Sequence, residues 1–110
     1  MEKIFNKLVR DKIPEIIEAN GEVAKCRVLD EQEFKAELEK KLFEEYNEVL
    51  EAQGSERVEE LADMLEIIKA LAEVEGSTLE QVLSVAENKA KKRGAFEKRI
   101  FLEKTIKQDK

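Results

Sequence analysis

The chain has 110 residues, of which 42% are charged and 42% are hydrophobic, and its formal net charge is −6. This length fits one ordinary domain, 1–110, and the apolar content argues against a disordered chain. The negative charge argues against nucleic acid as a general partner. Because histidine is absent and Cys26 is the only cysteine, the chain excludes Ser-His-Asp triads, Cys-His nucleophiles, histidine-bound zinc and an intrachain disulfide.

The sequence also indicates where the protein works. No apolar run approaches the ~20 residues needed to span a bilayer, so no membrane partner is expected. The first residues lack the apolar core of a signal peptide, and a lone cysteine is typical of reducing compartments. We therefore expect a cytoplasmic protein.

The N-terminal third is predicted to hold one short helix. Residues 10–20 fit a helix with Pro14 in its first turn and a stop signal at Asn20-Gly21. Residues 23–29 alternate roughly in polarity and could form a short strand. Residues 96–104 alternate as well, so the two segments could pair in a short two-stranded hairpin.

Two long helices are expected in the middle of the chain. Asp30 with Glu33 resembles a capping box, and the helix that it starts should run to about residue 53. Gly54-Ser55 is a short turn, with Ser55 as the expected N-cap of a second helix that ends near Gly76. Helices joined by so short a turn are antiparallel neighbours.

A further capping box at Ser77 to Glu80 predicts another helix, which should end near Gly94. The expected fold is therefore all-α, an antiparallel helical bundle of about four helices.

The first long helix carries an acidic residue within its apolar stripe. The stripe is formed by Leu38, Leu42, Val49 and Ala52, and its spacing leaves one member missing. Glu45 occupies that position, and Glu48 lies one turn further, beside the stripe. An ionised carboxylate on an apolar face is costly unless it is paired or bound to a metal.

The second long helix is apolar around almost its whole circumference. Its narrow solvated face carries Glu59, Glu66, Lys69 and Glu73, whereas Glu60 and Asp63 project from an otherwise apolar side. A helix of this kind must be buried, and a bundle this small can hardly enclose it. We therefore expect the chain to assemble with further copies of itself.

Two carboxylate pairs, Glu45/Glu48 and Glu60/Asp63, are each spaced i and i+3, so each pair shares one helix face. Because the helices are predicted to be neighbours, the four groups should converge. Lys41 is the only good basic partner expected nearby, which leaves a negative cluster that a divalent cation would neutralise. All-oxygen ligands favour Mg²⁺ or Mn²⁺ over zinc or copper. The alternative is a pair of acidic helices with salt bridges to Lys41 or to a partner chain.

These residues are similar to the EExxE…ExxD pattern of the MazG-like, all-α nucleoside triphosphate pyrophosphohydrolases, which are related to phosphoribosyl-ATP pyrophosphohydrolase and the dimeric dUTPases. The pattern here is Glu44-Glu45-x-x-Glu48 and Glu60-x-x-Asp63. Residues 6–15, NKLVRDKIPE, resemble the opening of a small single-domain subgroup. Residues 92–102, KRGAFEKRIFL, resemble its ending, with Ala95 in place of a glycine. The resemblance covers essentially the whole chain.

The resemblance implies a Mg²⁺ ion held by Glu45, Glu48, Glu60 and Asp63. It also implies cleavage between the α and β phosphates of a nucleoside triphosphate, and a homodimer or homotetramer. Glu44 or Glu45 is the candidate proton acceptor. The candidate phosphate ligands are basic residues from both ends of the chain and from the first long helix: Lys7, Arg10, Lys41, Lys92, Arg93, Lys98 and Arg99.

A second hypothesis is a non-catalytic helical module for oligomerisation or regulation, in which the metal site is structural. The complete carboxylate set, with basic segments at both ends of the chain, favours the enzyme.

Overall fold

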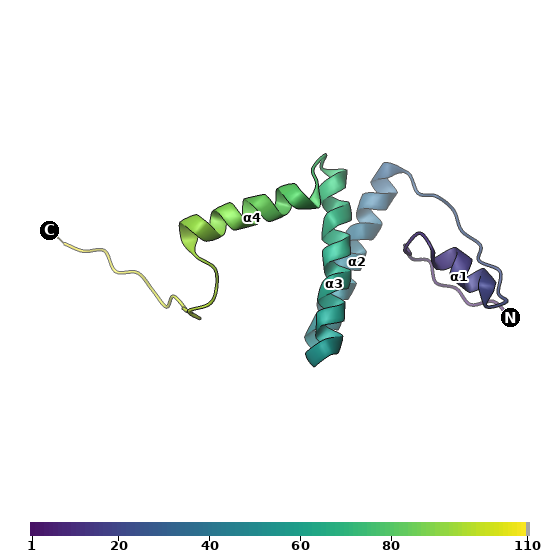
Figure 1. Ribbon diagram of the computed structural model, residues 1–110, viewed down its shortest axis with the longest axis horizontal. Coiled ribbons are helices and arrows are strands. Elements are labelled where there is room, and N and C mark those ends of the chain that lie inside the picture. Colours follow the sequence, from purple (N-terminus) through teal and green to yellow (C-terminus); the bar gives the residue numbers. More distant parts are fainter. Residues whose placement is uncertain (110) are drawn as a thin grey trace. The chain divides into compact units, whose positions relative to one another are not determined.

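The computed structural model describes residues 1–109. Within them the chain forms four helices and no strand, which confirms the predicted all-α fold (Figure 1). The helices are α1 (Ile13–Ala19), α2 (Glu31–Glu51), α3 (Gly54–Val74) and α4 (Leu79–Arg93). The chain divides into two compact units, Met1–Leu79 and Glu80–Lys110. None of the four helices combines the length and the apolar character needed to cross a membrane.

Local signals set both ends of α1. Pro14 lies in its first turn, where the missing N–H has no helical partner to lose. The Ile13 N–H donates to the Arg10 carbonyl over 3.0 Å, which closes the turn that leads into the helix. At the other end Gly21 takes a φ of +89°, a backbone conformation that favours glycine. The predicted stop at Asn20-Gly21 is confirmed.

The predicted N-cap of α2 is also confirmed. Asp30 Oδ1 accepts a 2.9 Å hydrogen bond from the Glu33 N–H, so one of the free donors of the first turn is satisfied. The carboxylate of Glu33 is bound by Arg27, whose Nη2 lies 2.9 Å from Glu33 Oε2. Hydrogen bonding to Arg27 lowers the pKa of Glu33 below its ordinary value. These contacts fasten the preceding segment to the start of α2.

The connection between α2 and α3 differs from the prediction at one residue. Ser55 is not the N-cap: α3 begins at Gly54, its N-cap position is Gln53, and no side chain caps it. Gly54 adopts a φ of +60°, a conformation that favours glycine, and the helix begins two residues earlier than a cap at Ser55 would place it. Only Ala52 and Gln53 separate the two helices, and both have extended backbone.

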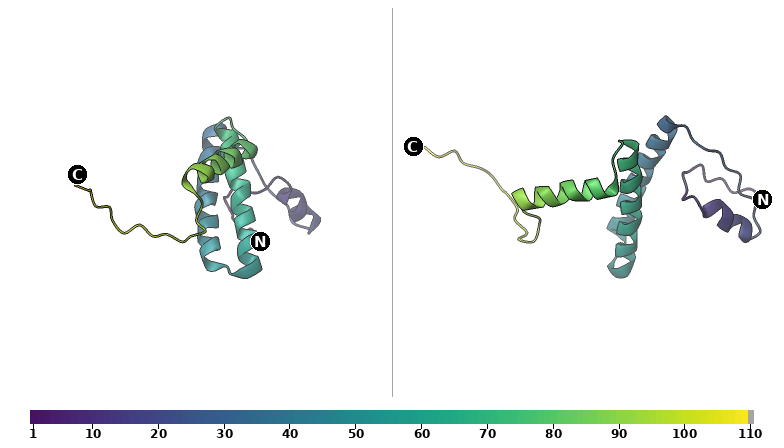
Figure 2. Two further views of the ribbon diagram at one scale, coloured as in Figure 1. Left: turned by 60° about the vertical axis from the view of Figure 1, so that its left-hand side comes forward. Right: turned by 45° about the horizontal axis from the view of Figure 1, so that its top comes forward.

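α2 and α3 pack against each other as antiparallel neighbours, as both views of Figure 2 show. Among residues 1–109 four apolar side chains are buried, all on these two helices: Leu38, Val49, Ile67 and Ala72. The predicted stripe on α2 therefore faces the partner helix, with Glu45 half-buried between Leu38 and Val49. The pair of long helices is the element that positions the carboxylates.

The suggested two-stranded hairpin is wrong. Within residues 1–109 neither 23–29 nor 96–104 contains a strand, and Val23 and Ile100 are exposed. A lone hairpin is marginal without a third strand or a helix to pack on. α4 ends at Arg93, next to Gly94 as predicted, with Lys91, Lys92 and Arg93 in its last turn.

Candidate metal centre

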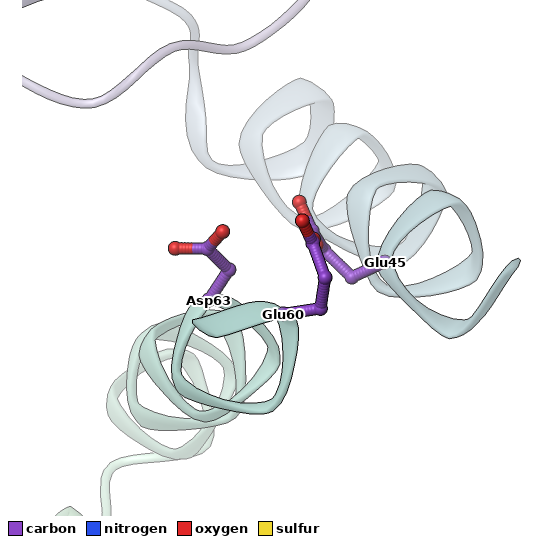
Figure 3. Close-up of side chains that lie close together, drawn as sticks. All are labelled: Glu45, Glu60 and Asp63. Carbon is purple, nitrogen blue, oxygen red and sulfur yellow. The ribbon is translucent and has the colours of Figure 1, made fainter. Parts of the chain in front are cut away.

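Three carboxylates from two helices converge on one point. Glu45 comes from α2, and Glu60 and Asp63 come from α3; one carboxylate oxygen from each lies within 4.8 Å of the others. Figure 3 shows all three side chains on the same side of the helix pair. We call these three residues the acidic cluster. The predicted convergence of the two helices' carboxylates is confirmed for this set.

Helix geometry accounts for the convergence. Glu60 and Asp63 are one turn apart on α3, so both point to the same side. Glu45 occupies the α2 position that faces α3, in the stripe that otherwise buries Leu38 and Val49. The short link between the helices leaves little freedom to change their register. The cluster is thus built on rigid elements rather than on loops.

Two oxygen atoms of the cluster are buried without a partner. Glu45 Oε2 and Glu60 Oε2 are shielded from solvent, and within residues 1–109 neither has a hydrogen-bond donor. Buried carboxylate oxygens without a donor are rare because their desolvation is costly. Oxygen atoms gathered within a few ångströms are what Mg²⁺ and Mn²⁺ take as ligands. The residues present therefore fit a divalent cation.

Crowding of the carboxylates also raises the pKa values of two of the three residues in the cluster. Burial, the proximity of Glu60 and the charge of Glu48 raise the pKa of the Glu45 carboxyl to about 7. Close approach of Glu48 raises the pKa of Glu60 above its ordinary value. Glu48 itself is exposed and lies at the edge of the cluster. Carboxylates crowded in this way hold protons unless a cation takes their place.

Arg10 corrects one expectation about the charge balance. Its Nη2 lies 2.7 Å from Asp63 Oδ1, so Lys41 is not the only basic group near the carboxylates. Arg10 belongs to the segment before α1, which lines one pocket together with residues of α2 and α3. Neither end of the bond is deeply buried: the side chain of Arg10 is 58% exposed and that of Asp63 is 44% exposed.

A pocket of about 420 Å³ lies beside the acidic cluster. Arg10, Lys41, Glu45 and Asp63 contribute its polar wall near the carboxylates. Its apolar wall comes from both long helices and from the segment before α1, through Leu8, Val9, Phe34, Leu38, Ile67 and Ala70. The full lining holds three basic side chains and five carboxylates, so a ligand in this pocket would meet both charges: Arg10, Lys41 and Lys69, with Asp11, Glu45, Asp63, Glu66 and Glu73.

The other predicted site residues are Glu44, Lys7 and four basic residues of the second unit. Glu44 is exposed on α2, and Lys7 Nζ lies 5.9 Å from the centre of the Phe5 ring. Lys92 and Arg93 end α4, and Lys98 and Arg99 follow it in the second unit; all four are exposed. The phosphate-binding role of these four residues stays a prediction.

Sequence reasoning missed the pocket wall formed by Leu8, Val9 and Phe34. Two adjacent apolar residues directly before Arg10 were the available signal, because such a pair in a loop needs a surface to pack on.

Searches against family models, curated proteins and solved structures found no match to this chain.

The raised pKa of Glu45 predicts how the stability of the protein depends on pH. Between its ordinary value of 4.5 and about 7, the folded protein holds this proton more tightly than the unfolded chain does. Stability from this group is therefore fully present below pH 4.5 and is lost as the pH rises through 7. We expect the melting temperature in EDTA to fall between pH 5 and pH 8, and saturating Mg²⁺ to reverse the loss at pH 8.

Thermal unfolding followed by circular dichroism at both pH values measures this effect. The lowered pKa of Glu33 has the opposite sign, but it acts below pH 4.5 and so does not interfere. A melting temperature that is constant, or that rises from pH 5 to pH 8 in EDTA, would contradict the prediction.

Proposed function

We propose that this protein is a Mg²⁺-dependent nucleoside triphosphate pyrophosphohydrolase. The observation that carries the proposal is the acidic cluster, with two buried, unpartnered carboxylate oxygens beside a pocket that also presents Arg10 and Lys41. A site with carboxylates alone would repel a polyphosphate. A site that bound phosphate alone would need only basic residues and no carboxylates. Together they match a ligand that consists of a polyphosphate and a divalent cation.

Each residue has a role in this proposal. Glu45, Glu60 and Asp63 would hold the cation, with Glu48 at the edge of the site. The bound cation would offset negative charge on the phosphate oxygens and acidify a water molecule. Arg10 and Lys41 line the pocket and can bind phosphate oxygens.

Two carboxylates are candidates for the group that takes the proton of the attacking water. Glu45 is the better placed, because it lines the pocket. Glu44, which is exposed on the same helix, is the second candidate.

We infer which bond is cleaved from the resemblance of the sequence to the EExxE…ExxD pattern. It implies attack at the link between the α and β phosphates, which gives a nucleoside monophosphate and pyrophosphate. Removal of non-standard nucleotides in the cytoplasm fits such an activity.

A substrate panel tests the proposal directly. The purified protein is incubated with canonical and modified nucleoside and deoxynucleoside triphosphates plus Mg²⁺, and release of monophosphate and pyrophosphate is measured. We expect turnover of at least one substrate and complete loss of it in EDTA. Asp63→Asn should lose about 100-fold or more of the activity, because a ligand of the charge-stabilising cation is neutralised. Glu48→Gln should lose less, because Glu48 lies at the edge of the cluster.

The possible results separate the hypotheses. No turnover on any substrate, or equal turnover by Asp63→Asn, would exclude the proposed enzymatic function. Metal binding without turnover would favour the non-catalytic module.

We also propose that the protein works as a homo-oligomer. Six large apolar side chains on α2 and α3 are between 44% and 65% exposed. They are Phe43, Tyr46 and Leu50 on α2, and Val58, Leu61 and Leu65 on α3. Within each helix the spacing is i, i+3, i+7, so each trio forms one stripe. We call these six residues the apolar face.

The apolar face lies on the opposite side of the helix pair from the acidic cluster. On each helix the exposed trio flanks the buried stripe on one side, and Glu48 or Asp63 flanks it on the other. Because α2 and α3 are antiparallel, the two trios fall on the same side of the pair. Contiguous apolar area of this kind marks an interface, and a second copy of the pair would present the matching surface.

A further inference from the structure

The salt bridge between Arg10 and Asp63 places a basic side chain on a carboxylate that the proposed function assigns to the cation. Arg10 Nη2 donates to Asp63 Oδ1 over 2.7 Å. Asp63 belongs to the acidic cluster, and both residues line the pocket. A guanidinium and a divalent cation that approach Asp63 therefore repel each other and draw on the same negative charge.

We propose that Arg10 is an internal counter-ion of the acidic cluster, which competes with the divalent cation for Asp63 and transfers to phosphate when both ligands are bound. This inference rests on the proposed function. It makes binding of the cation and binding of the polyphosphate mutually favourable, because each ligand removes what hinders the other.

The exposure of the pair permits the exchange. With 58% of the Arg10 side chain and 44% of the Asp63 side chain exposed, the ion pair is screened by solvent and is weak enough for a cation to displace. The exchange therefore needs a rotation of one side chain and no unfolding.

The surroundings of Arg10 favour its transfer to phosphate. Its carbonyl is held by the Ile13 N–H over 3.0 Å, so the backbone stays in place when the side chain moves. Lys41 lines the same pocket and would share the phosphate charge with it. Arginine binds a phosphate through two parallel hydrogen bonds, which makes a polyphosphate a strong alternative partner to one half-exposed carboxylate.

Calorimetric titration with Mn²⁺ in phosphate-free buffer tests the competition. We expect Arg10→Gln to bind Mn²⁺ about fivefold more tightly than the native protein, because an exposed ion pair and a repelling charge are removed. Arg27→Gln is the matched control, since Arg27 makes a comparable exposed pair with Glu33 away from the cluster. Its Mn²⁺ affinity should equal that of the native protein. A merely structural role of Arg10 predicts weaker binding in Arg10→Gln, so weaker or equal binding overturns the proposal.

Titration of the Mg²⁺-saturated protein with inorganic pyrophosphate tests the transfer. Arg10→Gln should bind pyrophosphate about tenfold more weakly, in line with the loss of a charge-assisted bidentate contact. Arg10→Lys should recover part of that affinity. Equal pyrophosphate binding by native protein and Arg10→Gln overturns the transfer.

The two titrations also separate this inference from the proposed function. Native protein that binds Mn²⁺ and hydrolyses a triphosphate, with no change in Arg10→Gln, overturns the inference alone. If the expected changes occur in a protein that hydrolyses no triphosphate, the inference is supported and the proposed enzymatic function is rejected. Absence of Mn²⁺ binding by the native protein overturns both.

Discussion

Replacement of Glu45 by glutamine is expected to stabilise the cation-free protein and, in the same variant, to remove its function. The pKa of Glu45 is raised to about 7, so its charged form is disfavoured at pH 8. Glutamine has nearly the same shape without the charge. We expect a gain of about 1 kcal/mol in the free energy of unfolding at pH 8 in EDTA, after allowing for solvent screening at this half-buried position.

The same substitution removes one ligand of the acidic cluster. Metal affinity should fall by more than about 100-fold, because loss of even an outer partner of a metal site costs 10–100-fold. Glu39→Gln is the matched control, since Glu39 is exposed on the same helix. Thermal unfolding in EDTA and calorimetry with Mn²⁺ give the two readouts. A variant Glu45→Gln that is destabilised in EDTA and keeps its metal affinity would show that Glu45 is a structural ion-pairing group instead.

Replacement of Leu61 by aspartate is expected to dissociate the oligomer. Leu61 is central on the α3 stripe of the apolar face and is 48% exposed. In a two-fold symmetric dimer the substitution occurs twice, and each buried leucine contributes about 1.5 kcal/mol or more. The dissociation constant should therefore rise by at least about two orders of magnitude.

Analytical ultracentrifugation over a range of protein concentrations measures this change. The native protein should sediment as a dimer or tetramer and Leu61→Asp as a smaller species. Val23→Asp is the control, because Val23 is 93% exposed but lies outside the helices and the apolar face. A native protein that sediments as a monomer, or a Leu61→Asp variant with an unchanged sedimentation coefficient, would contradict the oligomer proposal.

Sequence reasoning succeeded where the cause of a structure is local. The cap that Asp30 offers to Glu33 and the stop at Gly21 depend on a few neighbouring residues, and both are confirmed. The position of Glu45 in an apolar stripe follows from helix periodicity alone, which also predicts that Glu60 and Asp63 share a face. Once a short link makes the helices antiparallel, these local rules suffice to bring the acidic cluster together.

Features that depend on the path of a loop could not be predicted from the sequence. Arg10 and Asp63 are 53 positions apart, and their bond depends on where the segment before α1 lies against the helix pair. No periodicity encodes that path. The hairpin failed for a related reason: alternation within residues 23–29 describes one segment, but a strand exists only when a partner and a packing surface are also present.

The link between α2 and α3 has a consequence for how the protein can change in evolution. Surface connections usually accept inserted or deleted residues freely. Here Ala52 and Gln53 alone join the helix that carries Glu45 to the helix that carries Glu60, with Gly54 at a φ of +60°. If one residue were inserted in the link and became part of α3, the side chains of α3 would rotate by about a quarter turn about the helix axis. Glu60 would then point away from Glu45. The shortest loop of this chain should therefore vary less in length among descendants than the longer segments at either end.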